Sequence, residues 1–449
     1  MFNKEFLWGS STNAQQFEGG HDKGNKGLSI ADVRVIPNAD AEANFDDFKQ
    51  ASNHYEHYKE DIAYYHQMGF QIYRLTMAWT RIYPNGDDGA PNQEGIDFYS
   101  SVIDELLKYN IQPVVTLYAY DLPYHLVEKY NGFLSRECID EFLKYVRTVV
   151  TAFKGRVKYW VPFNEQNLLM FDTLYMTGYK CRNRQESFTV EHHMNLAYAQ
   201  CTKLIHEIDP RAKTGGNIGN ICPYPATCRA EDVEACEEYK YLVGYNYADV
   251  YVRKMYSGIY LKSLETLDLD QIILPGDLDI IAQAEPDFLS LTYYHSSIVK
   301  DEGKEKLLSP ANRKAVNPYL KQTEWKWNID PYGFKHFVKD YYHRYQIPIL
   351  ILENGYGYRD VPDEDGNIDD GYRIEFLRDH ILRMKEMVEE GVDIIGYLTW
   401  SAIDLYSTRE GFNKRYGFVY VDKDDDFKRI PKKSFYWYKK VIETNGEEL

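Results

Sequence analysis

The fold is indicated most clearly by two strand-like runs, PILILENG (348–355) and DIIGYLTWSAID (393–404), and by the residues between them. Both runs are short, apolar and rich in β-branched residues, as is typical of strands buried in a parallel sheet. Residues 369–391 lie between them and carry apolar side chains at alternating steps of three and four: Ile374, Leu377, Ile381, Met384 and Val388. This spacing predicts a helix with one buried face. Strand, helix and strand in this order predict a βαβ unit.

The same alternation extends outward through the chain. Helical patterns such as EFLKYVRTVVTAF (141–153) separate six further strand-like runs: FLWGSST (6–12), IYRLTMAW (72–79), QPVVTLYAYD (112–121), VKYWVPFNE (157–165), KTGGNIGN (213–220) and DFLSLTYYH (287–295). Eight such units in 449 residues favour an α/β fold, a single (β/α)8 TIM barrel with long loops after its strands. No Pro- or Ser-rich linker interrupts the pattern, so we expect one catalytic domain over residues 1–449. An open, doubly wound sheet is the alternative, but its G-x-G-x-x-G turn after the first strand is missing.

The composition narrows the classes of partner and the compartment. A formal net charge of −17 argues against nucleic acid as a partner, because a phosphate backbone requires a basic face. The same charge opposes an anionic substrate unless the site holds a local positive trap. The six cysteines show no C-x-x-C spacing and no zinc-ligand pattern, which favours reduced thiols in a cytoplasmic protein. The start, MFNKEFLWGSS, lacks a signal-peptide layout, and no apolar stretch is long enough to cross a membrane.

Polar residues at the ends of the eight runs are the candidates for chemistry, because a barrel of this type builds its active site at the carboxyl ends of its strands. Asn164 and Glu165 end one run, and Glu353 and Asn354 end another. Two glutamates at one mouth fit glycoside hydrolysis, in which one protonates the leaving oxygen and the other attacks or stabilises the anomeric carbon. A capping or salt-bridged glutamate is the structural alternative. A stray charge on an apolar strand is costly, however, unless it is paired or useful.

Long, ordered motifs cover nearly the whole chain, from FLWGSSTNAQQFEGG at the start to KKSFYWYKKVIETNG at the end. Between these two lie HYKEDIAYYHQMGFQIYRLTMAW, TLYAYDLP, WVPFNEQN, TEWKWNIDPYGF, LILENGYG and GYLTWSAIDLYSTREGFNKRYGFVYVD. With these motifs the sequence resembles glycoside hydrolase family 1, the family of β-glucosidases and 6-phospho-β-glycosidases. The resemblance implies a (β/α)8 barrel and a β-glycosidase that retains the anomeric configuration.

The resemblance also implies a role for each residue of the catalytic centre. Glu353 would be the nucleophile and Glu165 the general acid/base. Arg74 would lie beside Glu353 and lower the pKa of that carboxyl so that it stays ionised, and Tyr294 would donate a hydrogen bond to it. Four further residues would contact the substrate: Gln16 at hydroxyls 3 and 4, Asn164 at hydroxyl 2, Trp400 as the floor under the sugar ring and Trp325 as a platform for the leaving group. An ion pair, a core aromatic or a loop hydrogen bond is the structural alternative for the arginine, the tryptophans and the glutamine.

A retaining mechanism sets the expected geometry and chemistry. The two carboxyls should lie about 5–5.5 Å apart, too close for a water molecule to attack between them. Glu353 would form a covalent glycosyl-enzyme, while Glu165 would first protonate the leaving oxygen and then deprotonate water. No metal or organic cofactor enters this chemistry.

The stretch DLYSTREGFNKRYG (404–417) decides between phosphorylated and plain sugars. Family members that act on plain glucosides carry a Glu-Trp pair where this chain has Ser407 and Thr408. A carboxylate would repel a phosphate dianion, whereas the hydroxyl of Ser407, the ammonium of Lys414 and the phenol of Tyr416 can all donate to one. The pattern resembles the phosphate clamp of the 6-phospho-β-glycosidases. Thr408, where the resembling galactosidases have a tryptophan, favours a sugar of the gluco configuration.

Two positions depart from the family pattern. Ala119 stands where a histidine usually contacts the 3-hydroxyl, and Thr292 where an asparagine is usual. A lost donor that stabilises charge directly can cost about 2.7–4 kcal/mol in the transition state. Either Tyr118 or a water molecule substitutes for the histidine, or the space at Ala119 admits a sugar altered at carbon 3.

Two other functions stay open at this point. One keeps the chemistry without the phosphate, as in a β-glucosidase or β-galactosidase for unphosphorylated sugars. The other is a non-catalytic sugar-binding or sensing barrel, which Ala119 and Thr292 support and the intact Glu165, Glu353 and Arg74 oppose. If the phosphate clamp holds, the resemblance implies a small phosphorylated β-glycoside as substrate, delivered to a bacterial cytoplasm by a phosphotransferase uptake system.

Overall fold

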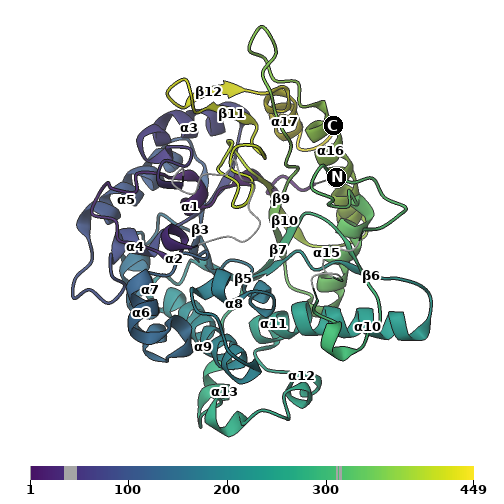
Figure 1. The fold of residues 1–449 in the computed structure, drawn as a ribbon. Coiled ribbons are helices and arrows are strands. Elements are labelled where there is room, and N and C mark those ends of the chain that lie inside the picture. The colour runs from purple at the N-terminus through teal and green to yellow at the C-terminus, as the bar shows by residue number, and fades with distance from the viewer. Residues whose placement is uncertain (1, 35–47, 310–311, 313–315) are drawn as a thin grey trace.

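The computed structural model describes residues 2–34, 48–309, 312 and 316–449. Parallel strands close into a barrel in the order β1-β10-β9-β7-β5-β4-β3-β2. Figure 1 shows these strands at the centre of the molecule and the helices in a ring around them. The strands are β1 Leu7–Ser11, β2 Ile72–Thr76, β3 Gln112–Tyr118, β4 Tyr159–Phe163, β5 Lys213–Gly219, β7 Phe288–Tyr293, β9 Ile349–Asn354 and β10 Ile394–Trp400. Each lies within one of the eight predicted runs, so the TIM barrel is confirmed and the open doubly wound sheet is wrong.

Long helices cover the outside of the barrel: α3 His54–Met68, α5 Gln93–Lys108, α7 Glu137–Ala152, α9 Arg184–Ile208, α10 Ala230–Lys240, α15 Pro331–Tyr345, α16 Gly371–Glu389 and α17 Lys433–Glu443. The predictions of helices at 141–153 and 369–391 are confirmed by α7 and α16. Short helices occupy the connections: α1 Ala14–Phe17, α2 Ile30–Val33, α4 Trp79–Ile82, α6 Tyr124–Tyr130, α8 Thr173–Thr177, α11 Asn246–Ala248, α12 Gly258–Ser263 and α13 Asp277–Ile281. Single helical turns complete them: Gly132–Leu134, Gln166–Met170, Tyr241–Tyr245, Asp249–Arg253, Leu269–Gln271 and Lys304–Lys306.

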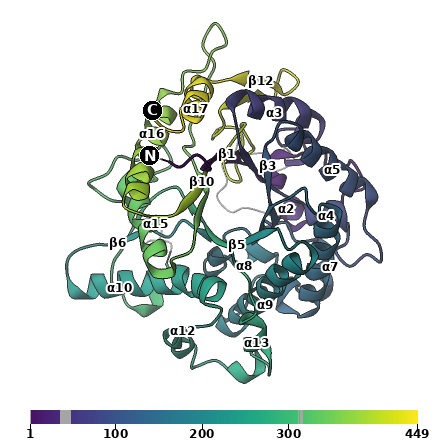
Figure 2. The ribbon, with the colours of Figure 1, turned by 180° about the vertical axis from the view of Figure 1, so that it is seen from behind.

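Two small sheets and the chain ends complete the architecture. β11 Val419–Asp422 and β12 Lys428–Pro431 form an antiparallel hairpin, and β6 Pro223–Pro225 pairs with β8 Ser297–Val299 in parallel. The termini lie close together, as Figure 2 shows from behind. The indole of Trp8 on β1 donates to Asn445 Oδ1 at 2.8 Å and so joins them.

The core has two layers, and the inner one supports the site. Apolar side chains fill the lower part of the barrel interior: Ile72, Val114, Val161, Phe288, Leu350, Leu352 and Leu398. Alternate residues of a strand share a face, so Arg74 on β2 points into the same interior two residues beyond Ile72. A larger apolar layer fills the space between the strands and the helices.

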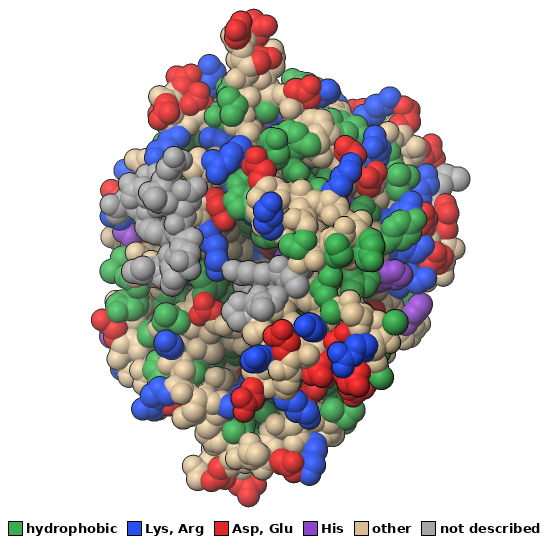
Figure 3. Space-filling view, turned by 45° about the vertical axis from the view of Figure 1, so that its right-hand side comes forward, with side chains coloured by type: hydrophobic (Ala, Val, Ile, Leu, Met, Phe, Trp, Pro, Cys, Tyr) green, Lys and Arg blue, Asp and Glu red, His purple; other side chains and the backbone are tan. Residues whose placement is uncertain are grey.

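The surface is mixed in charge. On the face shown in Figure 3, Lys and Arg side chains lie interspersed with Asp and Glu side chains. Of the helices that the structure describes, none combines the length and apolar character needed to span a lipid bilayer.

Candidate active site

Glu165 and Glu353 belong to one buried cluster at the carboxyl ends of the barrel strands. Arg74 donates from Nη1 to Glu353 Oε1 at 2.8 Å, and from Nη2 to Asn164 Oδ1. Nδ2 of Asn164 lies 3.3 Å from Glu165 Oε2. Two motifs that lie 188 positions apart are therefore joined by one guanidinium. The separation of the two carboxyls of about 5–5.5 Å stays a prediction.

Irregular backbone aims both glutamates. The register between β7 and β9 shifts after Leu291, so that Thr292 pairs with Glu353. Bulges of this kind re-aim a side chain next to active sites, and here Glu353 reaches Arg74 although its neighbour Leu352 belongs to the inner core. Glu165 has the left-handed φ of +43°, uncommon for residues other than glycine. Its amide is held by Asn217 Oδ1 at 2.8 Å.

Burial dominates the electrostatics of both carboxyls. It raises the pKa of Glu165 to about 8, the charge of Glu353 adds to this rise, and the hydrogen bond from Tyr120 opposes it. Burial also raises the pKa of Glu353, against the opposing effects of Arg74 and then Tyr294. Arg74 lowers the pKa of Glu353, as expected, but desolvation outweighs the ion pair, so the net shift of this pKa is upward. The guanidinium contacts Glu353 directly, and the charge of Glu353 in turn raises the pKa of Glu165.

The other residues expected around the sugar lie on the same mouth. Tyr294, which directly follows β7, donates to Glu353 Oε2 at 2.7 Å. Trp400 ends β10 and is 7% exposed. Gln16 on α1 donates to the carbonyl of Tyr406 at 3.0 Å, a loop hydrogen bond that was its structural alternative. The contacts predicted for these residues with a sugar stay predictions.

The loop after β10 brings Lys414 between aromatic rings. Its Nζ lies 3.7 Å from the ring centre of Trp327, 4.6 Å from that of Trp325 and 5.6 Å from that of Tyr416. Lys414 is 3% exposed, and burial lowers the pKa of its ammonium to about 8, although Glu410 opposes this. No carboxylate in the described part of the chain lies within the 4.0 Å of an ion pair with it.

Ser407 has a partner that the sequence did not suggest. Its hydroxyl donates to Glu410 Oε2 at 2.8 Å, and two backbone hydrogen bonds between Ser407 and Gly411 close the turn that carries Glu410. Position 407 is therefore a serine rather than a glutamate, but the turn brings the carboxylate of Glu410 into contact with the Ser407 hydroxyl of the predicted clamp.

Aromatic contacts connect this loop to the nucleophile candidate. The ring of Trp327 lies 5.5 Å from that of Tyr294, and Tyr294 donates to Glu353. The ring of Tyr416 lies 6.5 Å from that of Tyr294. Lys414 and Glu353 are thus two side chains apart, and the structure brings the predicted clamp and the two carboxyls into one site.

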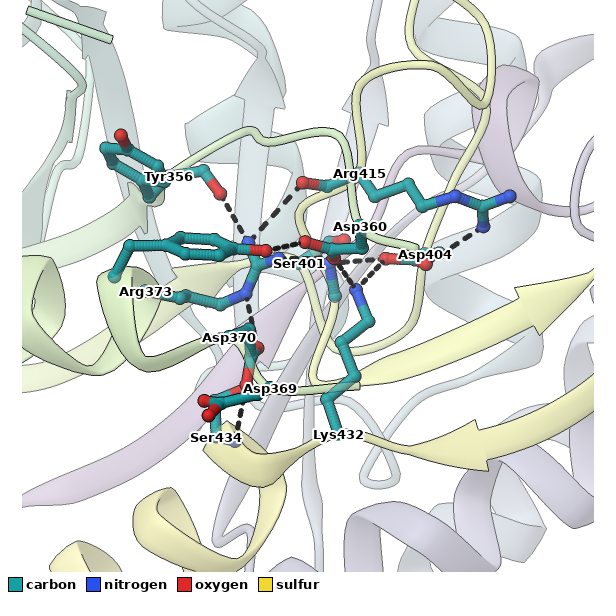
Figure 4. A network of polar contacts seen from close by, with 12 residues as sticks. Tyr356, Asp360, Asp369, Asp370, Arg373, Ser401, Asp404, Arg415, Lys432 and Ser434 are labelled. Atoms are coloured by element: carbon teal, nitrogen blue, oxygen red, sulfur yellow. Dashed lines mark hydrogen bonds and ion pairs between the residues drawn. The ribbon is translucent and has the colours of Figure 1, made fainter. Parts of the chain in front are cut away.

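A buried network of charges holds the base of the same loop (Figure 4). Lys432 Nζ donates to Asp404 Oδ1 at 2.6 Å and also pairs with Asp360. Arg373 donates to Asp360 Oδ2 at 2.6 Å, and Arg415 to Asp404 Oδ2 at 3.0 Å. The network joins the loops after β9 and β10 to the start of α17 and so fixes both ends of the loop that carries Lys414.

Thr292 and Ala119, the two positions that depart from the family pattern, have different surroundings. Thr292 is fully buried, and its Oγ1 lies 3.4 Å from Asn217 Nδ2. Tyr118 does not substitute for a histidine at Ala119, because its hydroxyl donates to the carbonyl of Met176. Tyr120 turns inward instead and donates to Glu165 Oε2 at 2.8 Å.

Three residues near the site were missed by reasoning from the sequence. Tyr120 is the next-to-last residue of the third strand-like run, where a search for polar strand ends could have found it. Trp327 lies two positions after Trp325 in TEWKWN, which is a visible signal of paired rings. Glu410 has no such signal, because its contact depends on the shape of one turn. Within the described residues, no three His, Cys, Asp or Glu side chains are grouped so that they could hold a metal ion.

Comparison with known proteins gives full-length matches. The family model described as Glycosyl hydrolase family 1 matches residues 1–447. An aryl-phospho-beta-D-glucosidase of Bacillus subtilis (strain 168) is 39% identical over 100% of this chain and 98% of its own length. A 6-phospho-beta-glucosidase of Escherichia coli (strain K12) is 39% identical over 100% of this chain and 99% of its own. The beta-glucosidase of Thermotoga maritima in complex with glucoimidazole superposes with a TM-score of 0.90 at 33% identity, covering 99% of each chain.

Proposed function

Since this chain belongs to glycosyl hydrolase family 1 and is a glycoside hydrolase, we propose that it hydrolyses 6-phospho-β-glucosides with retention of the anomeric configuration. The curated relatives named above carry phospho-β-glucosidase in their names and match over their full length. A plain β-glucosidase is also a structural neighbour, at a lower identity of 33%. The choice between the two substrates depends on the loop after β10.

The burial of the Lys414 side chain is the observation that supports a phosphorylated substrate. Its ammonium is buried with no ion-pair partner among the residues that the structure describes, which is costly, and burial lowers its pKa to about 8. A phosphate on carbon 6 of the sugar would supply the missing anion, with Ser407 and Tyr416 as further donors. The ammonium of Lys414 would in turn provide the local positive trap that a protein of net charge −17 needs for an anionic substrate.

The proposed chemistry assigns one role to each carboxyl. Glu165, whose pKa of about 8 keeps it protonated at neutral pH, gives its proton to the glycosidic oxygen. Glu353, ionised beside Arg74, attacks the anomeric carbon and forms an ester with it. In the second step Glu165, now an anion, takes a proton from water, and the water oxygen displaces Glu353. Tyr294 holds the attacking carboxylate through its hydroxyl.

The remaining residues serve binding in this proposal. Trp400 forms the floor of the sugar site, and Trp325 supports the leaving group. Gln16 and Asn164 bind hydroxyls. The amide nitrogen of Gln16 already donates to Tyr406, whereas Asn164 uses its oxygen for Arg74 and its nitrogen for Tyr120. Thr408 beside the clamp leaves the gluco configuration as the preferred one.

We further propose that the substrate is a small molecule met in the cytoplasm and that residues 1–449 act as one catalytic domain. All six cysteines are free thiols, which is typical of a reducing compartment. The closed barrel uses strands from both ends of the chain, since β1 pairs with both β2 and β10.

Paired assays test the substrate. We expect p-nitrophenyl β-glucoside 6-phosphate to be turned over far better than the same glucoside without phosphate. Lys414→Met should lower kcat/KM for the phosphorylated substrate by about 30-fold to several thousand-fold, the range of about 2–5 kcal/mol for truncating a buried charge partner. The plain glucoside should be affected little.

Lys439→Met is the matched control, because Lys439 is a surface lysine on α17, paired with Glu443. It should leave both substrates unchanged. Equal losses on both substrates in Lys414→Met, or a wild-type enzyme that prefers the plain glucoside, would remove the phosphate from the proposal.

A further inference from the structure

Tyr120, directly after Ala119 at the end of β3, places its hydroxyl in the catalytic cluster. The hydroxyl donates to Glu165 Oε2 at 2.8 Å, and it accepts from Asn164 Nδ2 at 2.9 Å. The backbone of Tyr120 has a left-handed φ of +63°. Such conformations are uncommon for residues other than glycine and cluster at functional sites.

Contacts on the far side of Tyr120 hold this conformation. Arg34 donates from Nη2 to the carbonyl of Tyr120. The same guanidinium lies 4.2 Å from the ring centre of Tyr175, and that ring lies 5.3 Å from the ring of Tyr120. Arg34 holds the carbonyl of Tyr120, and Tyr175 packs against its ring. These contacts support the orientation in which the hydroxyl reaches Glu165.

The polarity of the hydrogen bonds follows from Arg74. A guanidinium has only donors, so the atom of Asn164 that it reaches must be the oxygen. The amide nitrogen of Asn164 then faces Tyr120 and donates to its oxygen. The single proton of the phenol is left for Glu165 Oε2. Donors therefore run in one direction, from Arg74 through Asn164 and Tyr120 to Glu165.

We propose that Tyr120 is a positioning residue for the acid/base: by donating to Oε2 of Glu165, it reserves that oxygen as an acceptor and leaves Oε1 to carry the proton that moves in the reaction. The inference rests on the proposed function, because it needs Glu165 as the acid/base. Among the described residues no hydrogen bond is donated to Oε1. Gly219 leaves the room that Oε1 occupies, since a Cβ at this position would lie 2.5 Å from it.

Each step balances with the proton on Oε1. In the first, the proton passes from Oε1 to the glycosidic oxygen while the bond from that oxygen to the anomeric carbon breaks and Glu353 forms its ester. In the second, a water proton passes to Oε1 while the water oxygen bonds to the anomeric carbon and the ester breaks. Tyr120 keeps its own proton throughout and stabilises Glu165 whenever that carboxyl is ionised.

The pH profile of Tyr120→Phe tests the inference. Activity falls at alkaline pH where free Glu165 loses its proton, and the limb of kcat/KM reports that pKa. Without the phenol the ionised form loses a donor, so this limb should move upward by about one pH unit. The higher pKa also leaves a smaller fraction of Glu165 ionised as the base of the second step, so kcat on a p-nitrophenyl substrate should fall by up to about tenfold with a burst of p-nitrophenol. The other titratable groups that influence Glu165 stay in place: Arg74 on β2, Glu353 on β9 and Tyr294 after β7.

Two further variants separate positioning from packing. Tyr118→Phe makes the same change two residues earlier, at the last residue of β3, but the hydroxyl of Tyr118 contacts Met176 rather than Glu165, so the alkaline limb of this variant should stay where it is in the wild type. A 3-fluorotyrosine at position 120 keeps the shape and is a stronger donor, so it should move the limb downward. If Tyr120→Phe lowers kcat/KM equally at every pH and the fluorinated residue leaves the limb unmoved, the inference is wrong.

Glu165→Gln distinguishes failure of this inference from failure of the proposed function. Full activity in Glu165→Gln would overturn the acid/base assignment and the inference with it. An inactive Glu165→Gln together with an unmoved limb in Tyr120→Phe would overturn the inference alone. All profiles are measured on whichever glucoside the wild type turns over, so the result does not depend on the 6-phosphate.

Discussion

Two buried clusters of charge lie at the mouth of the barrel, and only one of them is balanced. The network under the loop after β10 sets three cations against three carboxylates: Lys432, Arg373 and Arg415 against Asp360, Asp370 and Asp404. In the cluster of Glu165 and Glu353, Arg74 is the only cation among the described residues that pairs with either carboxyl, through its contact with Glu353. Both clusters are almost fully removed from water, so the difference between them is in pairing rather than in burial.

The pKa values follow the pairing. Burial acts to raise the pKa of Asp360, but Arg373 and Lys432 outweigh it and hold that pKa well below its usual range. The same desolvation is only partly opposed in the catalytic cluster, so the pKa of Glu165 rises to about 8. A carboxylate with a full set of cationic partners stays ionised and holds the loops together. A carboxylate with too few partners has a pKa near neutrality and can therefore exchange a proton. Lys414 is the converse case, because it is a buried cation whose pKa is lowered to about 8 by desolvation that no ion pair among the described residues offsets.

Replacing Glu353, the proposed nucleophile, should have the largest effect. Glu353→Gln should lower kcat by a factor on the order of 10⁶, the size found when a covalent nucleophile is lost. Glu353→Gly should regain turnover when azide is added, because the anion fits the space that the carboxylate left. It attacks from the same face as Glu353, so the product should be an α-glycosyl azide, identified by NMR.

Glu165→Ala is the matched experiment on the opposite face. There azide should attack the glycosyl-enzyme after Glu353 has reacted and give the β-glycosyl azide. The same anomer from both variants would contradict the assignment of the two roles.

The balanced cluster should respond in stability rather than in chemistry. Lys432→Met leaves Asp360 and Asp404 short of a cation, and breaking a buried pair costs about 3–5 kcal/mol of the free energy of unfolding. Glu165→Gln should act in the opposite sense. The pKa of Glu165 is higher in the folded than in the unfolded chain, so its ionisation destabilises the fold progressively as pH rises above the unfolded value, and fully above about pH 8.

Thermal unfolding of both variants at pH 9 measures the contrast. Glu165→Gln should gain about 1–2 kcal/mol, as is common when a strained functional group is removed. A loss of stability in Glu165→Gln as large as that in Lys432→Met would show that the two clusters do not differ in the way described.

The fold was readable from the sequence because periodicity is a local signal. Every barrel strand lies within a predicted run, and both helices described from spacing are present. The two carboxyls were readable for a related reason, since strand ends of a barrel share one mouth. Arg74 was placed correctly beside Glu353 and lowers its pKa as expected, yet the net shift of the pKa of Glu353 was not predictable, because desolvation depends on how deeply the whole cluster is buried.

The details that failed depend on backbone turns. Tyr118 and Tyr120 are two positions apart on one run, and only the left-handed φ of Tyr120 decides which hydroxyl reaches Glu165. Similarly, the tight turn from Ser407 to Gly411 decides that Glu410 meets the clamp. Residue type and spacing do not encode either geometry.

The smallest expected effect is a change in KM on replacing Glu410, which tests directly how the charge of Lys414 is compensated. The carboxylate of Glu410 accepts from the hydroxyl of Ser407 and raises the pKa of Lys414, a cation that has no ion pair among the described residues. A phosphate must displace it, so Glu410→Gln, which keeps the shape without the charge, should lower KM for the phosphorylated glucoside by about two- to fivefold, the worth of a half-exposed charge. The plain glucoside serves as the internal control and should show no change.

The sign of this effect should depend on pH because Glu410 also supports the charge of Lys414. Burial lowers the pKa of Lys414 to about 8 and Glu410 opposes that fall, so without Glu410 the ammonium loses its proton at a lower pH. At about pH 6.5 Lys414 stays charged in both enzymes, and the gain in KM should be complete. At about pH 8.5 Glu410→Gln has less ammonium than the wild type, and the gain should shrink or reverse. A gain that is equal at both pH values would mean that Glu410 acts on the phosphate alone, and no gain at either would mean that its carboxylate leaves the hydroxyl of Ser407 at no cost.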